Sequence, residues 1–447
     1  MRRGLLTAIG HPARIVALAF AVAITVGSLL LSLPVAHQRG LHTDFVEAFF
    51  TATSAVSITG LSVVDTSTHW STFGQLVILV LIQIGGIGVM TLTSMLAVVM
   101  SPRLRLRFNF SVQTETGSLN PGDIGRVVRG VVKLSLFFEL IFSIVLSARL
   151  YLGYDRSFGA AVYEGTYHGI SAFNNAGFAL YTDSLTRYVT DPVICIPVGL
   201  AVIVGSLGFP VLLELRRELF SPRTWSLHTK ITIWVSAILL LVGPLVITVF
   251  EWGNARTLGS LDVGSRLMAG WFQGIMPRSG GLNTVDIGSM NSESLLVTDI
   301  LMFIGGGSAS TAGGIKVTTF AILAFVILAE IRGEPDVRVL NRTIRAAVIR
   351  QALTVVLLSV GVIVATTLLL LAMTDLALEF VLFDVISAFA TVGLSAGGLS
   401  EMPPAAHVIL AVLMFVGRLG PITVATALAA KERTRRYRLP EERPIVG

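Results

Sequence analysis

Four glycine-containing segments recur along the 447-residue chain, 104 to 117 residues apart, and they limit the folds that it can adopt. Aligned on their last glycine they read SAVSITG, SAFNNAG, IMPRSGG and SAFATVG, ending at Gly60, Gly177, Gly281 and Gly393. A second glycine follows each anchor glycine 24 to 28 residues later, at Gly85, Gly205, Gly305 and Gly417. Two landmarks kept in register over four copies indicate a repeat architecture.

Long apolar stretches flank each repeated segment. Only 13% of the residues are charged, about half the share usual in soluble domains. Eight stretches are long enough to cross about 30 Å of hydrocarbon at about 1.5 Å per residue. They cover residues 13–33, 72–100, 130–152, 192–215, 229–251, 294–330, 348–373 and 405–430. The chain is therefore expected to be a multi-pass integral membrane protein.

A shorter, partly apolar stretch lies between the two spans of each pair. The four are Asp44–Ile58, Ala160–Asn175, Gly264–Arg278 and Leu378–Thr391. At that length they cannot cross a bilayer, so they are expected to be re-entrant half-helices. The predicted fold is all-α, with four tandem helix–pore-half-helix–helix repeats around one pseudo-four-fold pore. The repeats are expected at 1–100, 101–220, 221–333 and 334–447, the last with a cytoplasmic C-terminal tail.

The positions of the basic residues predict the orientation. The net charge is +6, but Lys and Arg cluster beside the ends of the apolar spans, as the positive-inside rule describes. The clusters include Arg103–Arg107, Arg216–Arg217, Arg338–Arg345 and Arg433–Arg438. We expect both termini to lie in the cytoplasm, the chain to lie in the plasma or inner membrane among its lipids, and no binding to nucleic acid.

Backbone carbonyls beside the anchor glycines are the predicted ion-binding groups. A half-helix that enters from outside directs the negative end of its dipole at the membrane centre, so four such ends on one axis favour a cation. Glycine permits backbone angles that place carbonyls along the axis, and carbonyl rings form K⁺ filters. The predicted filter comprises Ile58, Thr59, Gly60, Asn175, Ala176, Gly177, Ser279, Gly280, Gly281, Thr391, Val392 and Gly393. The alternative is that each glycine only ends a buried helix.

Acidic residues follow three of the anchor glycines. Asp65, Asp183 and Asp286 could concentrate cations at the outer mouth or bond their own backbone in turns, and the sequence does not decide between these. Asp44 and Glu47 resemble a capping box at the start of the first half-helix.

The stretch 294–330 contains a candidate gate. Five glycines between Gly305 and Gly314 are unfavourable in a helix by about 1 kcal/mol each relative to alanine, which predicts helix–loop–helix. Unwound backbone at membrane depth is tolerated only where it is buried or lines a cavity. The predicted gate comprises Gly305, Gly306, Gly307, Ser308, Ser310, Thr311, Gly313, Gly314, Lys316 and Arg418. The alternative is a cytoplasmic linker.

Three basic residues fall within the membrane. Arg418 could bind the loop carbonyls or only brace the fold, and Lys316 could act in gating or extend to the inner surface. Arg278 is expected behind the filter, held by a carboxylate or by carbonyls, because a cation on the axis would repel K⁺.

No catalytic or metal-binding arrangement emerges. The histidines His37, His42, His69, His168 and His407 are scattered and mostly external, without metal-ligand spacing. A phosphate-binding loop and a nucleophile elbow are also missing. The chain is expected not to be an enzyme.

Four segments resemble the Trk/Ktr/HKT superfamily of potassium transporters, over essentially the whole chain. They are Asn174–Phe178, Pro277–Thr284, Gly305–Lys316 and Gly417–Pro421. The first span begins near Ile15 without extra leading helices, so the chain is most similar to the Ktr-type membrane subunits. The resemblance implies the filter residues above, an intramembrane gating loop at 305–314 and a gate-associated arginine at Arg418.

The resemblance also implies activity and partners. It implies channel-like K⁺ uptake, often Na⁺-dependent, by a homodimer of pore subunits on a cytosolic RCK-type regulatory ring. Any nucleotide is expected on that partner, and no metal beyond the transported K⁺. The alternative is an alternating-access secondary transporter or symporter for Na⁺ or K⁺. Such transporters use inverted repeats, whereas the four repeats here keep one orientation.

Overall fold

The computed structural model describes residues 12–100, 121–340 and 342–420, and these are mostly helical. Each repeat holds three helices, with a short middle helix of 12 to 16 residues between the other two. They are α2 (Pro12–Leu31), α3 (Phe45–Ser57) and α4 (Thr72–Met100); α6 (Pro121–Gly153), α7 (Phe158–Phe173) and α8 (Pro192–Leu207); α10 (Leu227–Glu251), α11 (Val263–Ile275) and α12 (Ser292–Phe303); α14 (Ala346–Leu371), α15 (Leu378–Phe389) and α16 (Pro404–Leu419). The predicted all-α membrane fold of helix–half-helix–helix repeats is confirmed.

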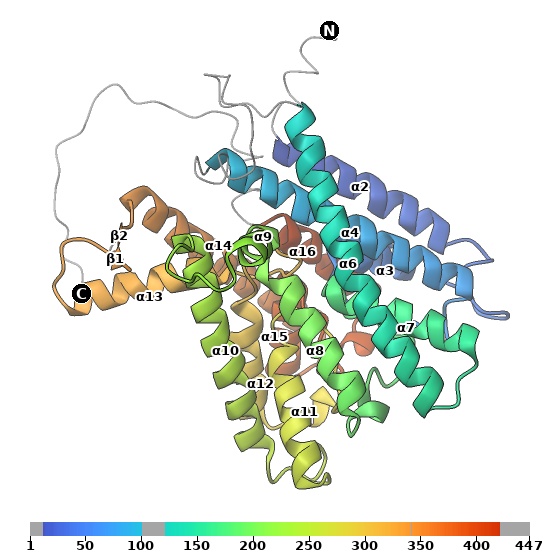
Figure 1. The fold of residues 1–447 in the computed structure, drawn as a ribbon. Helices are drawn as coiled ribbons and strands as arrows, with labels where there is room; N and C mark the ends of the chain where they lie inside the picture. The colour runs from blue at the N-terminus through green and yellow to red at the C-terminus, as the bar shows by residue number, and fades with distance from the viewer. Residues whose placement is uncertain (1–11, 101–120, 341, 421–447) are drawn as a thin grey trace.

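Smaller elements connect and follow these helices. They are α9 (Phe209–Glu218), α13 (Val317–Ile331), the short 3₁₀ helices η1 (Thr186–Tyr188), η2 (Ile287–Ser289) and η3 (Leu399–Glu401), and the strands β1 (Arg338–Val339) and β2 (Arg342–Thr343). The two strands pair antiparallel, with Val339 opposite Arg342. Helix α13 extends away from the bundle toward this hairpin (Figure 1).

Burial differs between the short and the long helices. The second half of each short helix is almost fully buried, as at Val56, Phe173 and Phe389. The long helices keep large apolar side chains exposed, among them Leu241 at 71% and Leu357 at 70%. Exposed leucines on this scale suit a lipid environment, where they need no protein cover.

Four described helices are long and apolar enough to cross a bilayer unaided, and they lie within α4, α6, α10 and α14. Helices α2, α13 and α16 are shorter apolar helices. The stretch 294–330 is helix–loop–helix, as predicted, with α12 and α13 on either side of residues 304–316. The last part of the predicted span 405–430, from residue 421, lies outside the described residues, as do the N-terminal segment and the basic clusters at 103–107 and 433–438.

The apolar stretch predicted as a span over 192–215 is broken into two helices. The chain bends by 100° between α8 and α9. Gly208 at the bend has φ +94°, which favours glycine, and Pro210 starts α9 where its missing N–H costs nothing. The bend wraps α9 around the loop that follows α12.

Candidate functional site

The four anchor glycines meet in a closed ring. A Cβ atom added to Gly60 would lie 2.8 Å from Gly177 Cα, and one on Gly177 would lie 3.0 Å from Gly281 Cα. One on Gly281 would lie 3.3 Å from Gly393 Cα, and one on Gly393 would lie 3.1 Å from Gly60 Cα. The structure therefore brings together, around one axis, segments more than 100 residues apart in the chain.

Carbonyl oxygens crowd the same ring. A Cβ on Gly60 would lie 2.4 Å from the Ala176 oxygen, and one on Gly393 would lie 2.2 Å from the Thr59 oxygen. Real Cβ atoms do not approach so closely, so a side chain at either glycine would displace a backbone oxygen of the neighbouring repeat. These oxygens belong to the candidate filter.

All four segments share one backbone signature. The residue two positions before each anchor glycine has a positive φ, at Ile58 (56°), Asn175 (59°), Ser279 (76°) and Thr391 (47°). The anchor glycines themselves have φ of 92°, 71°, 70° and 101°. Positive φ in a residue other than glycine carries a steric cost that the surrounding structure must balance. The same costly conformation in four copies indicates a shared structural purpose.

Serine hydroxyls hold three of the turns and were missed as site residues in the sequence. Ser54 Oγ accepts from Gly60 N–H at 3.0 Å, and Ser387 Oγ accepts from Gly393 N–H at 3.1 Å. Ser171 Oγ donates to the Phe178 carbonyl at 2.7 Å. The signal was a serine six residues before the glycine in three repeats, while the third repeat has Ile275 there.

The C-terminal ends of three half-helices pack closely against the second glycine of their repeat. In repeats one, two and four, an added Cβ would lie 2.2 Å from Val56 O at Gly85, 2.1 Å from Phe173 O at Gly205 and 1.9 Å from Phe389 O at Gly417. Each of these carbonyls comes four residues before its anchor glycine. In repeat three the pattern changes, because a Cβ added to Gly305 would lie 1.9 Å from the Gly313 carbonyl oxygen of the loop.

A cavity of about 350 Å³ opens on one side of the ring, the side expected to face outward, and all four anchor glycines line it. Asp65 also lines it, while its carboxylate accepts from Ser67 N–H (2.6 Å) and Thr68 N–H (3.0 Å). Asp183 instead pairs with Arg187 at 2.6 Å, and Asp286 bonds Gly288 N–H at 3.2 Å. Among the three acidic residues, only Asp65 combines the turn role with a place at the mouth.

The loop between α12 and α13 is buried below the ring rather than exposed as a linker. Ser310 and Thr311 are at most 1% exposed. Its backbone bonds the α8–α9 bend, since Gly307 N–H donates to Ser206 O (2.8 Å) and Phe209 N–H donates to Ala309 O (3.0 Å). The bend and the loop therefore form one packed unit.

Ser279 connects this loop to the ring. Its hydroxyl donates to the Thr391 carbonyl at 2.8 Å and accepts from Gly313 N–H at 3.2 Å. The Thr391 and Thr311 hydroxyl oxygens are buried without a hydrogen-bond partner among the described residues. Buried hydroxyl oxygens without a partner can bind a cation or a water.

Arg278, Arg418 and the half-buried Lys316 all bond backbone carbonyls. Arg418 Nη1 donates to Thr311 O at 2.5 Å, and Lys316 Nζ donates to Ala312 O at 2.6 Å. Arg278, 2% exposed, donates to the carbonyls of Ser236 (3.2 Å) and Gly305 (3.4 Å). Arg278 is thus braced by carbonyls, one of the two supports expected from the sequence.

A polar network behind the second repeat was also missed. Asn174, adjacent to the candidate filter, donates to Glu139 at 2.9 Å and to Gln83 at 3.1 Å, and Gln83 donates to Glu139 at 3.0 Å. The network ties α4 and α6 to the second half-helix.

The histidines are less scattered than expected. His37 lies 6.4 Å from His42 and 6.5 Å from His69, ring centre to ring centre.

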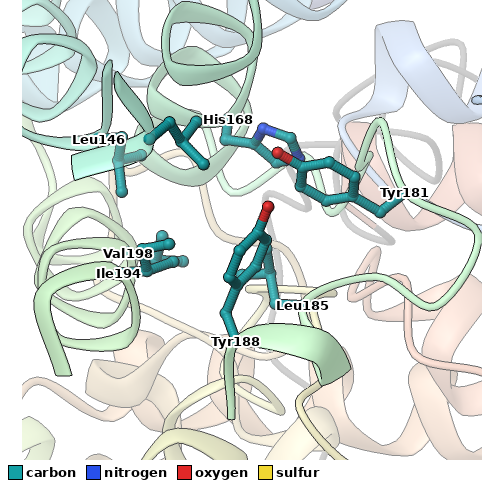
Figure 2. Close-up of a pocket in the computed structure, with 8 residues that line it drawn as sticks. Leu146, His168, Tyr181, Leu185, Tyr188, Ile194 and Val198 are labelled. Carbon is teal, nitrogen blue, oxygen red and sulfur yellow. The ribbon is translucent and has the colours of Figure 1, made fainter. Parts of the chain in front are cut away.

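His407 is buried, and so is His168, which stacks on Tyr181 at 4.8 Å (Figure 2). His168 Nε2 accepts from Leu180 N–H at 3.2 Å, so Nδ1 carries the proton toward Glu164 O, 2.7 Å away. This histidine packs the turn after the second anchor glycine.

The glutamate of the capping box is in place, because Asp44 N–H donates to the Glu47 carboxylate at 3.1 Å.

Comparisons with known proteins agree along the whole chain. The TrkH family, described as cation transport protein, matches residues 15–437. Ktr system potassium uptake protein B of Bacillus subtilis (strain 168) is 37% identical over 98% of this chain and 97% of that protein. The protein of the same name from Vibrio alginolyticus is 37% identical over 98% of this chain and 95% of that protein. The crystal structure of the potassium transporter TrkH from Vibrio parahaemolyticus shares the fold, with a TM-score of 0.76 at 18% identity, covering 93% of this chain and 84% of that one.

Proposed function

The chain belongs to the TrkH family of cation transport proteins, and from this premise we propose that it is the ion-translocating membrane subunit of a potassium uptake system. The observation that carries the proposal is the closed ring of four glycines with positive φ and the carbonyls packed around it. A ring of backbone carbonyl oxygens can replace the hydration shell of K⁺. The family is a cation transport family rather than an enzyme family.

Ions enter this pathway from the outer cavity. Asp65 holds a negative charge at the mouth, since partial burial would raise the pKa of its carboxyl but hydrogen bonds from Ser67 and Thr68 lower it below the usual value. The half-helix dipoles then favour the cation at the ring. Permeation is channel-like through the residues proposed as the filter, and both termini lie in the cytoplasm.

The buried loop is the proposed gate. It lies directly below the ring, bonds the carbonyl-lined segment through Ser279, and is held by Arg418 from the neighbouring repeat. Flow requires this loop to leave the axis. The regulatory step is proposed to come from a cytosolic RCK-type ring that carries any nucleotide, bound by a homodimer of this chain.

Purified protein in liposomes tests the proposal. With K⁺ trapped inside, external ⁸⁶Rb⁺ should accumulate by exchange, and bilayer recordings should give steady currents too large for a carrier. Repeating the uptake with and without external Na⁺ tests Na⁺ dependence. Uptake that saturates at carrier turnover and shows no unitary currents would favour alternating access and overturn the channel mechanism.

A further inference from the structure

Two buried carboxylates lie on helices that pack against each other where the third and fourth repeats join. Asp299 of α12 is 6% exposed and Asp384 of α15 is fully buried. Asp299 Oδ1 and Asp384 Oδ2 have no hydrogen-bond partner among the described residues. The two groups lie close enough to interact electrostatically. Neither residue belongs to the filter or the gate proposed above.

No described cation compensates the pair. Besides the two aspartates, the titratable groups on α12, α15 and the helices packed against them are Glu293, Glu379, His228, Lys230, Glu251, Arg350, His407 and Arg418, the last of which bonds Thr311 O. None of these forms a hydrogen bond or ion pair with either aspartate in the described part of the chain. Glu251 bonds Asn291 N–H at 2.8 Å, and His407 Nε2 lies 2.9 Å from Leu399 O.

Two buried carboxylates that interact in a low-dielectric interior cannot both stay ionised without a counter-charge. One bound proton removes one of the two charges. We propose that Asp299 and Asp384 form a proton-binding pair that holds one proton at neutral pH. Binding converts one carboxylate and a proton into a carboxylic acid, with no other reactant. A bound metal cation would instead need several further oxygen ligands.

The pair has a path to the outside. Ser395 lines the outer cavity and its side chain lies beside the Asp384 carboxylate. Ala396 N–H donates to Asp384 Oδ1 at 3.4 Å, three residues beyond the anchor glycine Gly393. A proton from the external solution therefore reaches the pair through the wall of the cavity.

The pair also touches the elements that position the pore. Asp384 lies on the fourth half-helix, and α12, which carries Asp299, leads directly into the buried loop. Loss of the shared proton would leave two like charges that push α12 and α15 apart. This consequence for ion flux rests on the proposed function, whereas the proton itself does not.

Infrared difference spectroscopy on the purified full-length protein measures the proton directly. A protonated buried carboxyl gives a C=O stretch above the carboxylate region, and one such band should be present at pH 7 in the wild type. It should be missing from Asp299→Asn/Asp384→Asn and remain in Glu379→Gln, which changes an exposed glutamate of the same half-helix. Asp384→Glu keeps a carboxyl at the site, and its spectrum is measured instead if the double variant does not fold.

Loss of about one bound proton per chain, assigned to these residues, supports the pair. A wild-type spectrum at pH 7 in which the double variant removes no protonated band overturns it, because both groups are then ionised. A band that disappears on addition of Na⁺ at constant pH also overturns it, by assigning the site to a metal cation. Rb⁺ uptake measured against external pH is a separate readout, and its failure alone would count against the proposed pore.

Discussion

Arg418 and Lys316, which lie in different repeats, donate hydrogen bonds to consecutive carbonyls of the same loop, those of Thr311 and Ala312. No ion pair to either cation is present among the described residues, and Arg418 Nε and Nη2 have no partner there. Two positive charges therefore lie next to each other below the ring of carbonyls. This arrangement holds the loop, and in the proposed gate these two charges are the barrier to cations.

Replacing Arg418 should open the pathway. Arg418→Gln removes a charge-assisted bond of about 1.5–3 kcal/mol, which shifts a closed–open equilibrium by about tenfold to a hundredfold at about 1.4 kcal/mol per decade. Deleting residues 306–310 should act in the same direction. The measurement is ⁸⁶Rb⁺ flux per membrane-inserted protein, with the external Arg187→Gln as control. If Arg418 only braces the fold, the amount of protein falls while flux per molecule does not rise.

Gly393→Ser should weaken discrimination against Na⁺. Its new Cβ would lie 2.2 Å from Thr59 O, so the ring must distort. Gly361→Ser on α14 is a matched control, because nothing lies within 4 Å of its added Cβ. The ratio of Rb⁺ to Na⁺ uptake should fall for the first variant only. An unchanged ratio at normal protein levels would remove Gly393 from the filter.

Ser279→Ala should loosen the loop from the ring. It leaves Thr391 O and Gly313 N–H without their bridge, at a cost of about 1–3 kcal/mol for each buried unpaired group. Flux should rise, and a double variant with Arg418→Gln should rise by less than the product of the single effects, since both act on one loop. Independent effects would mean that the two bonds hold different structures.

Asp191→Asn should destabilise the outer end of the second repeat in a pH-dependent way. Its carboxylate accepts from Arg149 Nε and Tyr154 Oη, both at 2.8 Å. Burial would raise the pKa of Asp191, but these bonds hold it below the usual value. A depressed pKa contributes stability above the unfolded value near 3.9, and that stability is lost as pH falls through the folded pKa.

The Tm of Asp191→Asn should therefore lie below that of the wild type at pH 7, by an amount equivalent to about 1 kcal/mol. The difference should narrow as pH falls below about 4. Asp155→Asn, an exposed change in the preceding loop, should match the wild type at both pH values. A gap that stays constant with pH would assign the effect to helix capping at Val193 N–H instead of to the charge.

The exposed arginines of the hairpin should bind the proposed regulatory ring. Arg338 and Arg342 lie on β1 and β2 and are solvent-exposed. Reversing both charges should release a co-purifying ring at low salt, and high salt should release it from the wild type, because the Debye length is about 3 Å at 1 M. Binding that survives both treatments would exclude this surface.

Much of the fold could be predicted because the repeat is visible as a recurring glycine pattern in the sequence. The bounds of the half-helices agree within three residues, and the glycine-rich stretch was expected to interrupt its span. The bend at Gly208 was missed, although Gly-Phe-Pro is a strong breaker signal. Hydrophobicity alone favoured one continuous helix there, and the loop packed inside the bend compensates for the break.

The missed parts of the site depend on contacts between repeats. Asp299 and Asp384 are 85 positions apart (384 minus 299), and nothing local to either predicts that α12 and α15 bring them together. The Ser279 bridge likewise joins repeats three and four. The filter and gate residues stay predictions, supported by the ring and the buried loop, until ion flux is measured.

A ring closed within one chain has a consequence for genetics. In a pore built from four identical subunits, every substitution appears four times. Fewer than four of the equivalent positions can be altered only by assembling wild-type and variant chains together. Here Gly60, Gly177, Gly281 and Gly393 can be altered one at a time. The sequence of each of the four ring segments can therefore change independently. A graded series of single, double and triple variants can measure how many intact segments ion selection requires.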